Sequence, residues 1–329
     1  MLIVGAGLTG LKAAEGLHGR AGSITVVDMA DRVLPSVTDA ESSAIVREYL
    51  EDKGIAFHLS DRVEKYGDGF AVLASGKTLA FDVLITSVGV RPNTELAASV
   101  GCMTERMTES GRAFRGIVVD ENQYTGVGEI YAAGDCTLSY DLTLGNTRPL
   151  AIQPNAYMQG EAAGAAMSGK PRPRREYLPV NSCGLLGLRM ITAGAYDGEP
   201  ITVRKDGSFR RFFVADGKLR GFIMLGEYSR VGILTEMIRK GTPVGSVDFA
   251  SLIENPDLGA LGDDRVDLAH AAGYRGLATL QQGFVGLAHG FLSGRSSGRP
   301  GQRMKAGRKL PKAACDDRLP RDLQARQGS

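Results

Sequence analysis

The sequence predicts an α/β protein with a parallel sheet and helices in its first part and a smaller α+β domain after it. At the start of the chain, the apolar strand of residues 2–4 leads into a glycine-rich turn and a helix at 11–17 that ends near Gly19. Residues 63–81 hold three short β-type segments separated by Asp-Gly and Ser-Gly turns, which predict a β-meander. Residues 178–244 hold strands with Asp-Gly turns, followed by a helix at 231–239. A chain of 329 residues has room for two or three such domains.

Residues 2–54 predict a βαβ unit followed by a second helix. The first strand and helix are followed by a β-branched strand at 24–27, which ends at Asp28. Thr38 and Glu41 have the spacing of a capping box, so we expect them to begin a helix that ends at Gly54.

The next segments predict further strands and one more helix. Residues 82–88 form an almost uninterrupted apolar run, typical of a strand buried on both faces, and we place this strand in the centre of the sheet. Residues 116–120 and 129–135 predict two more strands, and small residues dominate a helix at 155–167. A stretch rich in proline and arginine at 171–175 predicts a domain edge.

Composition and charge exclude several classes of function. The net charge of +2 argues against nucleic acid as the main partner, and no apolar run approaches the roughly 18 residues of a membrane span. Without a basic leader before the first strand, the protein is interpreted as cytoplasmic. The four cysteines lie far apart without a Cys-x-x-Cys pair, so no metal site is predicted and any redox chemistry must come from a cofactor.

The turn after the first strand has the Gly-x-Gly-x-x-Gly pattern of a dinucleotide site. In this pattern the glycines allow a tight turn, close approach of a pyrophosphate and close packing of the helix, whose N-terminus attracts the anion. Asp28 ends the second strand and can accept hydrogen bonds from a ribose 2′-hydroxyl, which favours NADH over NADPH. The nearby Arg32 weakens that preference and leaves NADP(H) open. The predicted residues of the turn are Gly5, Ala6, Gly7, Leu8, Thr9 and Gly10.

Several separated motifs resemble one family. The glycine turn with the following Leu34-Pro35, the run at 86–93 that contains Gly89, and the run from Thr125 to Gly134-Asp135 all contribute. The segments at 154–160 and 219–226 agree with them. Together they resemble the FAD-dependent pyridine nucleotide-disulfide oxidoreductases, in the branch of the rubredoxin reductases, NADH oxidases and nitrite reductase large subunits. The resemblance runs from Met1 to about Leu258.

The resemblance implies a Rossmann-like NAD(P)-binding domain at 1–90, the C-terminal part of a FAD-binding domain at 91–170, and a small α+β interface domain at 178–258. A basic tail at 263–329 is expected to be disordered, and either genuine or the product of a misread gene end. Asp135 would bind the ribityl hydroxyls of FAD. The implied activity passes hydride from NADH to FAD and electrons to an unidentified acceptor, either a small molecule or an electron-transfer protein. No catalytic residue is identified.

The resemblance also implies a homodimer, formed through the last domain of the chain. Four phenylalanines in that domain offer apolar faces for this contact, and their alternative role is that of ordinary core residues. They are Phe209, Phe212, Phe213 and Phe222.

Two features depart from the family pattern. The family places a FAD-binding half before the NAD domain, whereas here Met1 lies at the first strand, so we interpret the chain as N-terminally truncated and expect it to bind NADH weakly and FAD hardly at all. Lys12 stands where the family usually carries a glutamate, and its alternative role is that of a surface lysine. Two other functions stay open at this point: an NAD-binding or dimerising module without flavin, and an inactive fragment.

Overall fold

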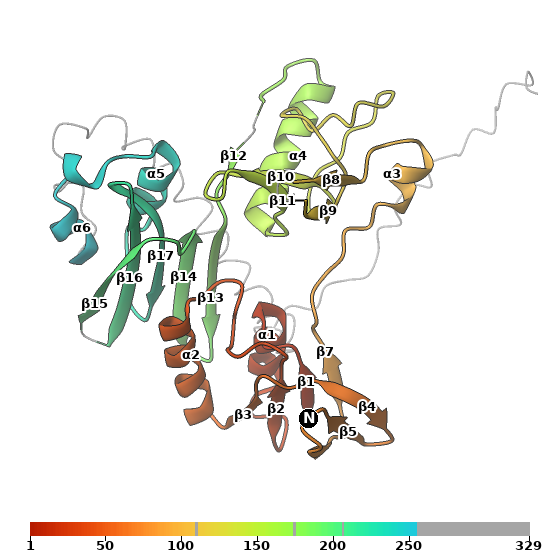
Figure 1. Ribbon diagram of the computed structural model, residues 1–329, viewed down its shortest axis with the longest axis vertical. Coiled ribbons are helices and arrows are strands. Elements are labelled where there is room, and N and C mark those ends of the chain that lie inside the picture. The colour runs from red at the N-terminus through yellow and green to blue at the C-terminus, as the bar shows by residue number, and fades with distance from the viewer. Residues whose placement is uncertain (109–110, 174–175, 206, 255–329) are drawn as a thin grey trace, which may run out of the picture. The chain divides into compact units, whose positions relative to one another are not determined.

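The computed structural model describes residues 1–108, 111–173, 176–205 and 207–254, and its elements are labelled in Figure 1. The first sheet has the strand order β3-β2-β1-β7 and is parallel throughout. Ile3 pairs with Val26 on one side and with Ile85 on the other. The α/β prediction is therefore confirmed. The strands are β1 (Leu2–Val4), β2 (Ile24–Val27), β3 (Ile55–His58) and β7 (Leu84–Thr86).

The two faces of this sheet are covered by different elements, because alternate residues of each strand point to opposite faces. Ile3 and Val26 are fully buried in one core with residues of α1 (Leu8–Leu17) and α2 (Ala40–Asp52). Leu2 and Val27 instead pack against a three-stranded antiparallel sheet on the other side. That sheet is the predicted meander, formed by β4 (Val63–Gly67), β5 (Phe70–Leu73) and β6 (Thr78–Ala80).

The position expected for residues 82–88 is wrong. Among the described strands, β7 is at the edge of its sheet and pairs only with β1. Val83 is 52% exposed and Val88 is 77% exposed, so the apolar run is not covered on both faces. An apolar run shows that a segment can be buried, but strand order depends on how the chain crosses over, which the run does not encode.

The capping box expected at the start of α2 is also wrong. The N-cap is Asp39, whose side chain accepts a hydrogen bond from the backbone N–H of Ser42 at 3.0 Å. The hydroxyl of Thr38 donates instead to the carbonyl of Leu34 at 2.9 Å. Glu41 forms ion pairs with two arginines of the last sheet, so tertiary contacts compete with the local motif.

The middle of the chain contains short strands and one long helix. It contains α3 (Glu95–Ser99), β8 (Glu105–Met107), β9 (Ala113–Arg115), β10 (Leu138–Asp141), β11 (Asn146–Pro149), α4 (Gln153–Met167) and β12 (Glu176–Tyr177). The strands expected at 116–120 and 129–135 are wrong, because these segments pair only through isolated bridges, Ile117 with Thr137 and Tyr124 with Tyr131. A strand needs a continuous ladder of backbone hydrogen bonds, and a single bridge does not supply one.

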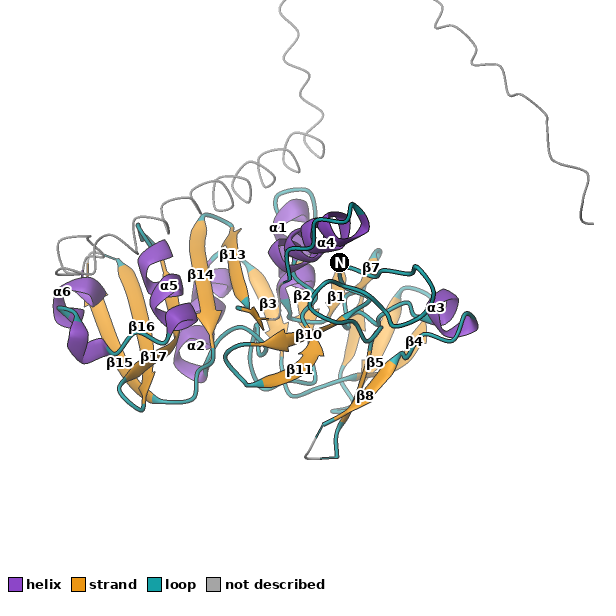
Figure 2. Ribbon diagram, turned by 90° about the horizontal axis from the view of Figure 1, so that it is seen from above, coloured by secondary structure: helices purple, strands orange, loops and turns teal. Residues whose placement is uncertain are grey.

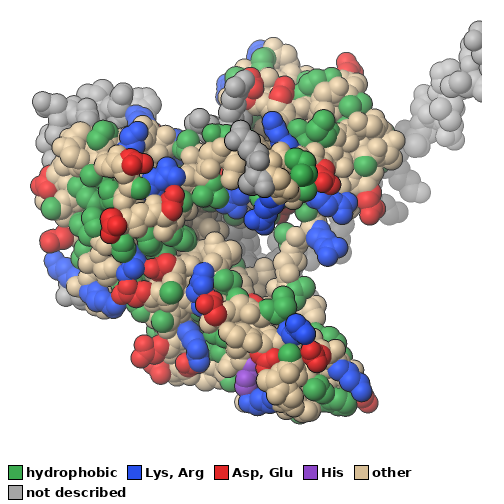
Figure 3. All heavy atoms as spheres, viewed as in Figure 1, with side chains coloured by type: hydrophobic (Ala, Val, Ile, Leu, Met, Phe, Trp, Pro, Cys, Tyr) green, Lys and Arg blue, Asp and Glu red, His purple; other side chains and the backbone are tan. Residues whose placement is uncertain are grey.

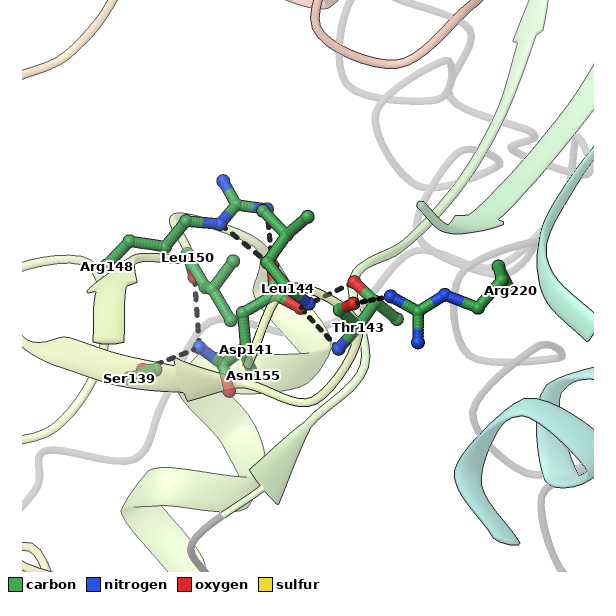
Figure 4. Close-up of polar contacts among 8 residues, drawn as sticks. All are labelled: Ser139, Asp141, Thr143, Leu144, Arg148, Leu150, Asn155 and Arg220. Carbon is green, nitrogen blue, oxygen red and sulfur yellow. Dashed lines mark hydrogen bonds and ion pairs between the residues drawn. The ribbon is translucent and has the colours of Figure 1, made fainter. Parts of the chain in front are cut away.

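A buried carboxylate ties the β10–β11 hairpin together (Figure 4). Asp141 is fully buried, and one of its oxygens accepts from Arg148 Nε at 2.8 Å and Nη2 at 2.6 Å. The other oxygen accepts from the backbone N–H and the hydroxyl of Thr143, at 2.8 and 2.6 Å. Arg220 donates to the carbonyl of Thr143 at 2.6 Å, so the hairpin also contacts the last sheet.

The last sheet is antiparallel with the order β13-β14-β17-β16-β15. Figure 2 shows α5 (Gly232–Lys240) and α6 (Phe249–Glu254) beside it, and their apolar residues share one core with Phe212 and Phe222. Phe209 and Phe213 belong to the core that also contains α1 and α2. The strands are β13 (Val180–Leu185), β14 (Leu188–Gly194), β15 (Glu199–Lys205), β16 (Ser208–Ala215) and β17 (Lys218–Leu225), and a 3-10 turn spans Val244–Ser246.

All four phenylalanines offered as dimer faces are at most 4% exposed in the single chain. They are core residues, so the interpretation of them as a docking face is wrong. The surface of the described residues carries side chains of both charge signs on the face shown in Figure 3. None of the helices described is long and apolar enough to cross a membrane. The expected tail at 263–329 lies outside the described residues.

Candidate functional site

The glycine turn between β1 and α1 is packed tightly on two sides and open on the third. A Cβ on Gly5, which has a φ of 113°, would overlap the carbonyl oxygen of Ser87 and lie 2.8 Å from its carbon. A Cβ on Gly10 would overlap the carbonyl oxygen of Gly5. A Cβ on Gly7 would meet no atom of the described residues within 4 Å. The first and third glycines are thus required by the fold, whereas the space in front of Gly7 is free for a ligand.

The first turn of α1 is suited to an anion. Its N-cap is Gly7, which has no side chain to satisfy the free N–H groups, and no acidic residue lies in the first turn. These N–H groups and the helix dipole give this end of α1 a partial positive charge, beside the open space at Gly7. Leu8 and Thr9 are the first residues of the helix, so their backbone N–H groups belong to this set. A pyrophosphate fits this arrangement.

Asp28 is held against the turn from the end of β2. One carboxylate oxygen accepts from the N–H of Ala6 at 2.6 Å, and the other accepts from the N–H of Ala30 at 2.8 Å. Each oxygen can accept one more hydrogen bond, so the carboxylate can also bind a diol. Arg32 forms an ion pair with Asp31 at 2.9 Å, which offsets the positive charge that a 2′-phosphate would need.

The loop after β7 completes this end of the sheet. The N–H of Ser87 donates to the carbonyl of Val4 at 2.7 Å, which places the loop beside the glycine turn. Gly89 follows with a φ of 104°, and a Cβ there would meet nothing within 4 Å. Val88 and Val90 are both 77% exposed, so this loop presents an apolar edge.

Gly134 and Asp135 belong to a second turn, which precedes β10. Gly134 has a φ of 88°, and its N–H donates to the side chain of Gln159 at 2.5 Å. Asp135 is exposed, and no hydrogen bond or ion pair joins its carboxylate to the described residues. The carboxylate is therefore free to accept hydrogen bonds from hydroxyl groups of a ligand.

Two thiols have raised pKa values: Cys136, which follows Asp135, and Cys183, which lies near Lys12 and Glu15. Burial, with the neighbouring Asp135 charge, raises the pKa of Cys136, which suits a packing residue better than a redox-active thiol. Burial raises the pKa of Cys183 from its ordinary value of 9.0 to about 11. Both thiols are therefore protonated at neutral pH.

Lys12 is not a free surface lysine, because its side chain forms tertiary contacts. Its ammonium forms an ion pair with Glu15 and donates to the carbonyl of Gly184 at 3.1 Å. Glu15 in turn accepts from the N–H of Leu186 at 2.8 Å. These contacts join α1 to the β13–β14 hairpin across more than 170 positions of the chain, and no local signal in the sequence predicts them.

Gln159 is a site residue that the sequence reasoning missed. It is fully buried in α4 and contacts the turn that carries Asp135. One signal could have indicated it. Asn155 and Gln159 are polar residues four positions apart in a helix of mostly small residues, a spacing that puts both on one face.

Comparison with known proteins identifies the first part of the chain. Residues 1–160 match the family model described as pyridine nucleotide-disulphide oxidoreductase. This part of the chain belongs to that family. The pyridine nucleotide-disulphide oxidoreductase domain thus contains the glycine turn, Asp28, the Ser87–Gly89 loop and the Gly134–Asp135 turn.

Individual relatives agree with the family match. An NADH oxidase of Methanocaldococcus jannaschii is 37% identical over 51% of this chain and 36% of its own length. A probable ferredoxin reductase of Castellaniella defragrans is 32% identical over 66% of this chain and 53% of its own length. The solved NAD-dependent persulfide reductase of A. fulgidus superimposes with a TM-score of 0.66 at 26% identity, covering 74% of this chain and 49% of that one. The chain spans between about a third and a half of the length of these relatives.

Proposed function

We propose that the protein is a FAD-dependent oxidoreductase that accepts hydride from NADH and passes electrons to a separate acceptor. The single observation that carries the proposal is the glycine turn: its first and third glycines are enclosed by backbone, and its second faces open space beside a free helix N-terminus and a fixed carboxylate. This combination fits a dinucleotide pyrophosphate with an adjacent ribose.

In this function the chain's own residues bind and orient. The backbone N–H groups at the start of α1 would hold the pyrophosphate, Asp28 would accept the ribose 2′-hydroxyl, and the Gly89 loop would lie beside the nucleotide. Asp135 would accept hydrogen bonds from the ribityl hydroxyls of FAD. Bound FAD supplies the redox chemistry, since it accepts a hydride and releases the electrons to an acceptor.

The nucleotide preference is proposed to be for NADH. A 2′-phosphate placed at Asp28 would meet a carboxylate whose two oxygens are already fixed by backbone N–H groups, and Arg32 is engaged by Asp31. The negative charges of the 2′-phosphate and of the Asp28 carboxylate would repel each other. NADPH therefore binds more weakly than NADH in this proposal.

The acceptor is proposed to be a small electron-transfer protein. The Castellaniella relative is named a probable ferredoxin reductase, which supports this choice over a small molecule. Reduction of a ferredoxin by the purified protein is followed through the visible absorbance of the ferredoxin. NADH-dependent reduction supports an electron-transfer protein as acceptor, and its absence would contradict this choice.

Domain organisation, assembly and location are part of the same proposal. We propose an NAD-binding domain at 1–90, part of a FAD-binding domain at 91–170, and an interface domain at 178–258 that forms a homodimer. Light scattering of the purified chain gives its mass in solution, and a monomer at micromolar concentration would contradict the dimer.

The proposed location is the cytoplasm. Cys102, Cys136 and Cys183 are free thiols, which supports a reducing compartment of this kind.

The test of the function is to titrate the purified chain with NADH and with FAD, and to follow NADH oxidation with ferricyanide as acceptor. Saturable NADH binding together with flavin-dependent NADH oxidation supports the proposal. Saturable NADH binding by a colourless protein that takes up no flavin would instead support an NAD-binding module.

A further inference from the structure

One buried side chain holds the turn that carries Asp135. Gln159 is fully buried, and its amide oxygen accepts from the N–H of Gly134 at 2.5 Å and from the hydroxyl of Thr137 at 2.9 Å. Its amide N–H donates to the hydroxyl oxygen of Ser139 at 2.5 Å. Gln159 thus contacts the residue before Asp135, the second residue after it, and strand β10, which follows.

Further hydrogen bonds restrain the turn and the start of β10. The N–H of Thr137 donates to the carbonyl of Gly134 at 3.0 Å, which closes the turn around Asp135. The hydroxyl of Thr137 lies 2.8 Å from the same carbonyl oxygen, so its single proton is shared between that oxygen and the amide oxygen of Gln159. Asn155, one helical turn before Gln159, donates to Ser139 at 3.1 Å and to the carbonyl of Leu150 at 3.0 Å (Figure 4). The same face of α4 therefore fixes the turn and the start of β10.

The carboxylate of Asp135 is exposed, although the backbone of its turn is held in place. Its backbone lies between two residues that Gln159 binds, yet its carboxylate is exposed and forms no hydrogen bond or ion pair with the described residues. A carboxylate on a fixed backbone binds hydroxyl groups with less loss of conformational freedom than one on a mobile loop.

We propose that Gln159 is a positioning residue, which sets the backbone of the Gly134–Thr137 turn and thereby aims Asp135 at the hydroxyl groups of the flavin side chain. The proposal rests on the proposed function, because the flavin is assigned to Asp135 there. Its first part, the fixing of the turn, concerns the ligand-free chain and can be tested without flavin.

The experiment compares three glutamine variants of the chain. Gln159→Met keeps the volume and removes the hydrogen bonds, whereas Gln159→Glu keeps an oxygen that can accept from Gly134 and Thr137. Gln153→Met is the matched control, because Gln153 is exposed on the same helix. Hydrogen exchange of the Gly134 amide is measured in the ligand-free chain, and FAD affinity is measured by titration of flavin fluorescence up to millimolar FAD.

We expect exchange at Gly134 to be at least about tenfold faster in Gln159→Met and close to wild type in Gln153→Met, with Gln159→Glu between them. Starting from the weak FAD binding expected of this chain, the dissociation constant for FAD should rise about tenfold in Gln159→Met, a change of about 1.4 kcal/mol. The partial rescue by Gln159→Glu distinguishes positioning from helix packing, since a buried carboxylate disturbs packing at least as much as methionine does.

Each outcome decides a part of the proposal. Unchanged exchange in Gln159→Met overturns the fixing of the turn, and faster exchange with unchanged FAD affinity overturns the link to the flavin. If the wild type shows no saturable FAD binding, the proposed function fails together with that link, while the exchange data still decide whether Gln159 fixes the turn. Should Gln159→Met not fold, Thr137→Val removes one of the same hydrogen bonds and carries the comparison.

Discussion

Replacing Gly10 with alanine should destabilise the fold at the glycine turn. A Cβ at this position would overlap the carbonyl oxygen of Gly5, lie 3.1 Å from its carbon and lie 3.4 Å from Cγ2 of Ile3. Carbon atoms in favourable contact are about 3.5 to 4.0 Å apart, so α1 would have to move away from β1. Gly5 is closely packed as well, because a Cβ there would overlap the carbonyl oxygen of Ser87.

The size of the effect follows from two opposing terms. Inserting a methyl group into a closely packed site costs about 1 to 3 kcal/mol, and the upper end applies because the added Cβ would overlap a backbone oxygen and not the end of a flexible side chain. Alanine within a helix gains about 1 kcal/mol over glycine. We therefore expect Gly10→Ala to lower the free energy of unfolding by roughly 2 kcal/mol.

Urea unfolding followed by far-UV circular dichroism measures this difference. Gly16→Ala is the control in the same helix, because a Cβ at Gly16 would meet no atom within 4 Å. We expect that control to be as stable as the wild type, or up to about 1 kcal/mol more stable. If Gly10→Ala is as stable as Gly16→Ala, then Gly10 is not needed for the packing of α1 on β1 and the reasoning is refuted.

Further changes have separate expected results. Gly7→Ala should leave stability unchanged but weaken NADH binding at least about tenfold, since its Cβ occupies the open side of the turn, and equal affinity in calorimetry would contradict the assignment. Asp28→Ala should narrow the gap between NADH and NADPH affinity by about 1 to 3 kcal/mol, and tighter NADPH binding by the wild type would show the preference to be wrong. The raised pKa of Cys183 keeps its thiol protonated in the folded chain, so its contribution to stability is complete below pH 9 and is lost between pH 9 and about 11; Cys183→Ala should show a smaller loss between those pH values in urea titrations. Arg148→Met should cost about 3 kcal/mol, because it leaves the buried carboxylate of Asp141 without its cation, and a loss below 1 kcal/mol in the same titrations would show that the pair is dispensable.

The sequence predicted those parts of the candidate site that depend on neighbouring residues. The Gly-x-Gly-x-x-Gly turn can be recognised because strand, turn and helix are contiguous, and their local geometry follows from glycine's lack of a side chain. Gly134 and Asp135 were found through a resemblance and not from local chemistry. Gln159 was missed, because its role depends on a helix packing against a turn 25 positions earlier in the chain.

By itself, the sequence determined the alternation of strands and helices over residues 2–52, the meander and the glycine turn, because these depend on periodicity and on short-range turn chemistry. Only the tertiary structure decided that β7 lies at the sheet edge, that Asp39 and not Thr38 caps α2, and that Lys12 contacts the β13–β14 hairpin. The physical reason is the same in each case. Strand order, burial and long-range ion pairs depend on which distant segments pack together, and the local pattern of a segment does not specify its partner.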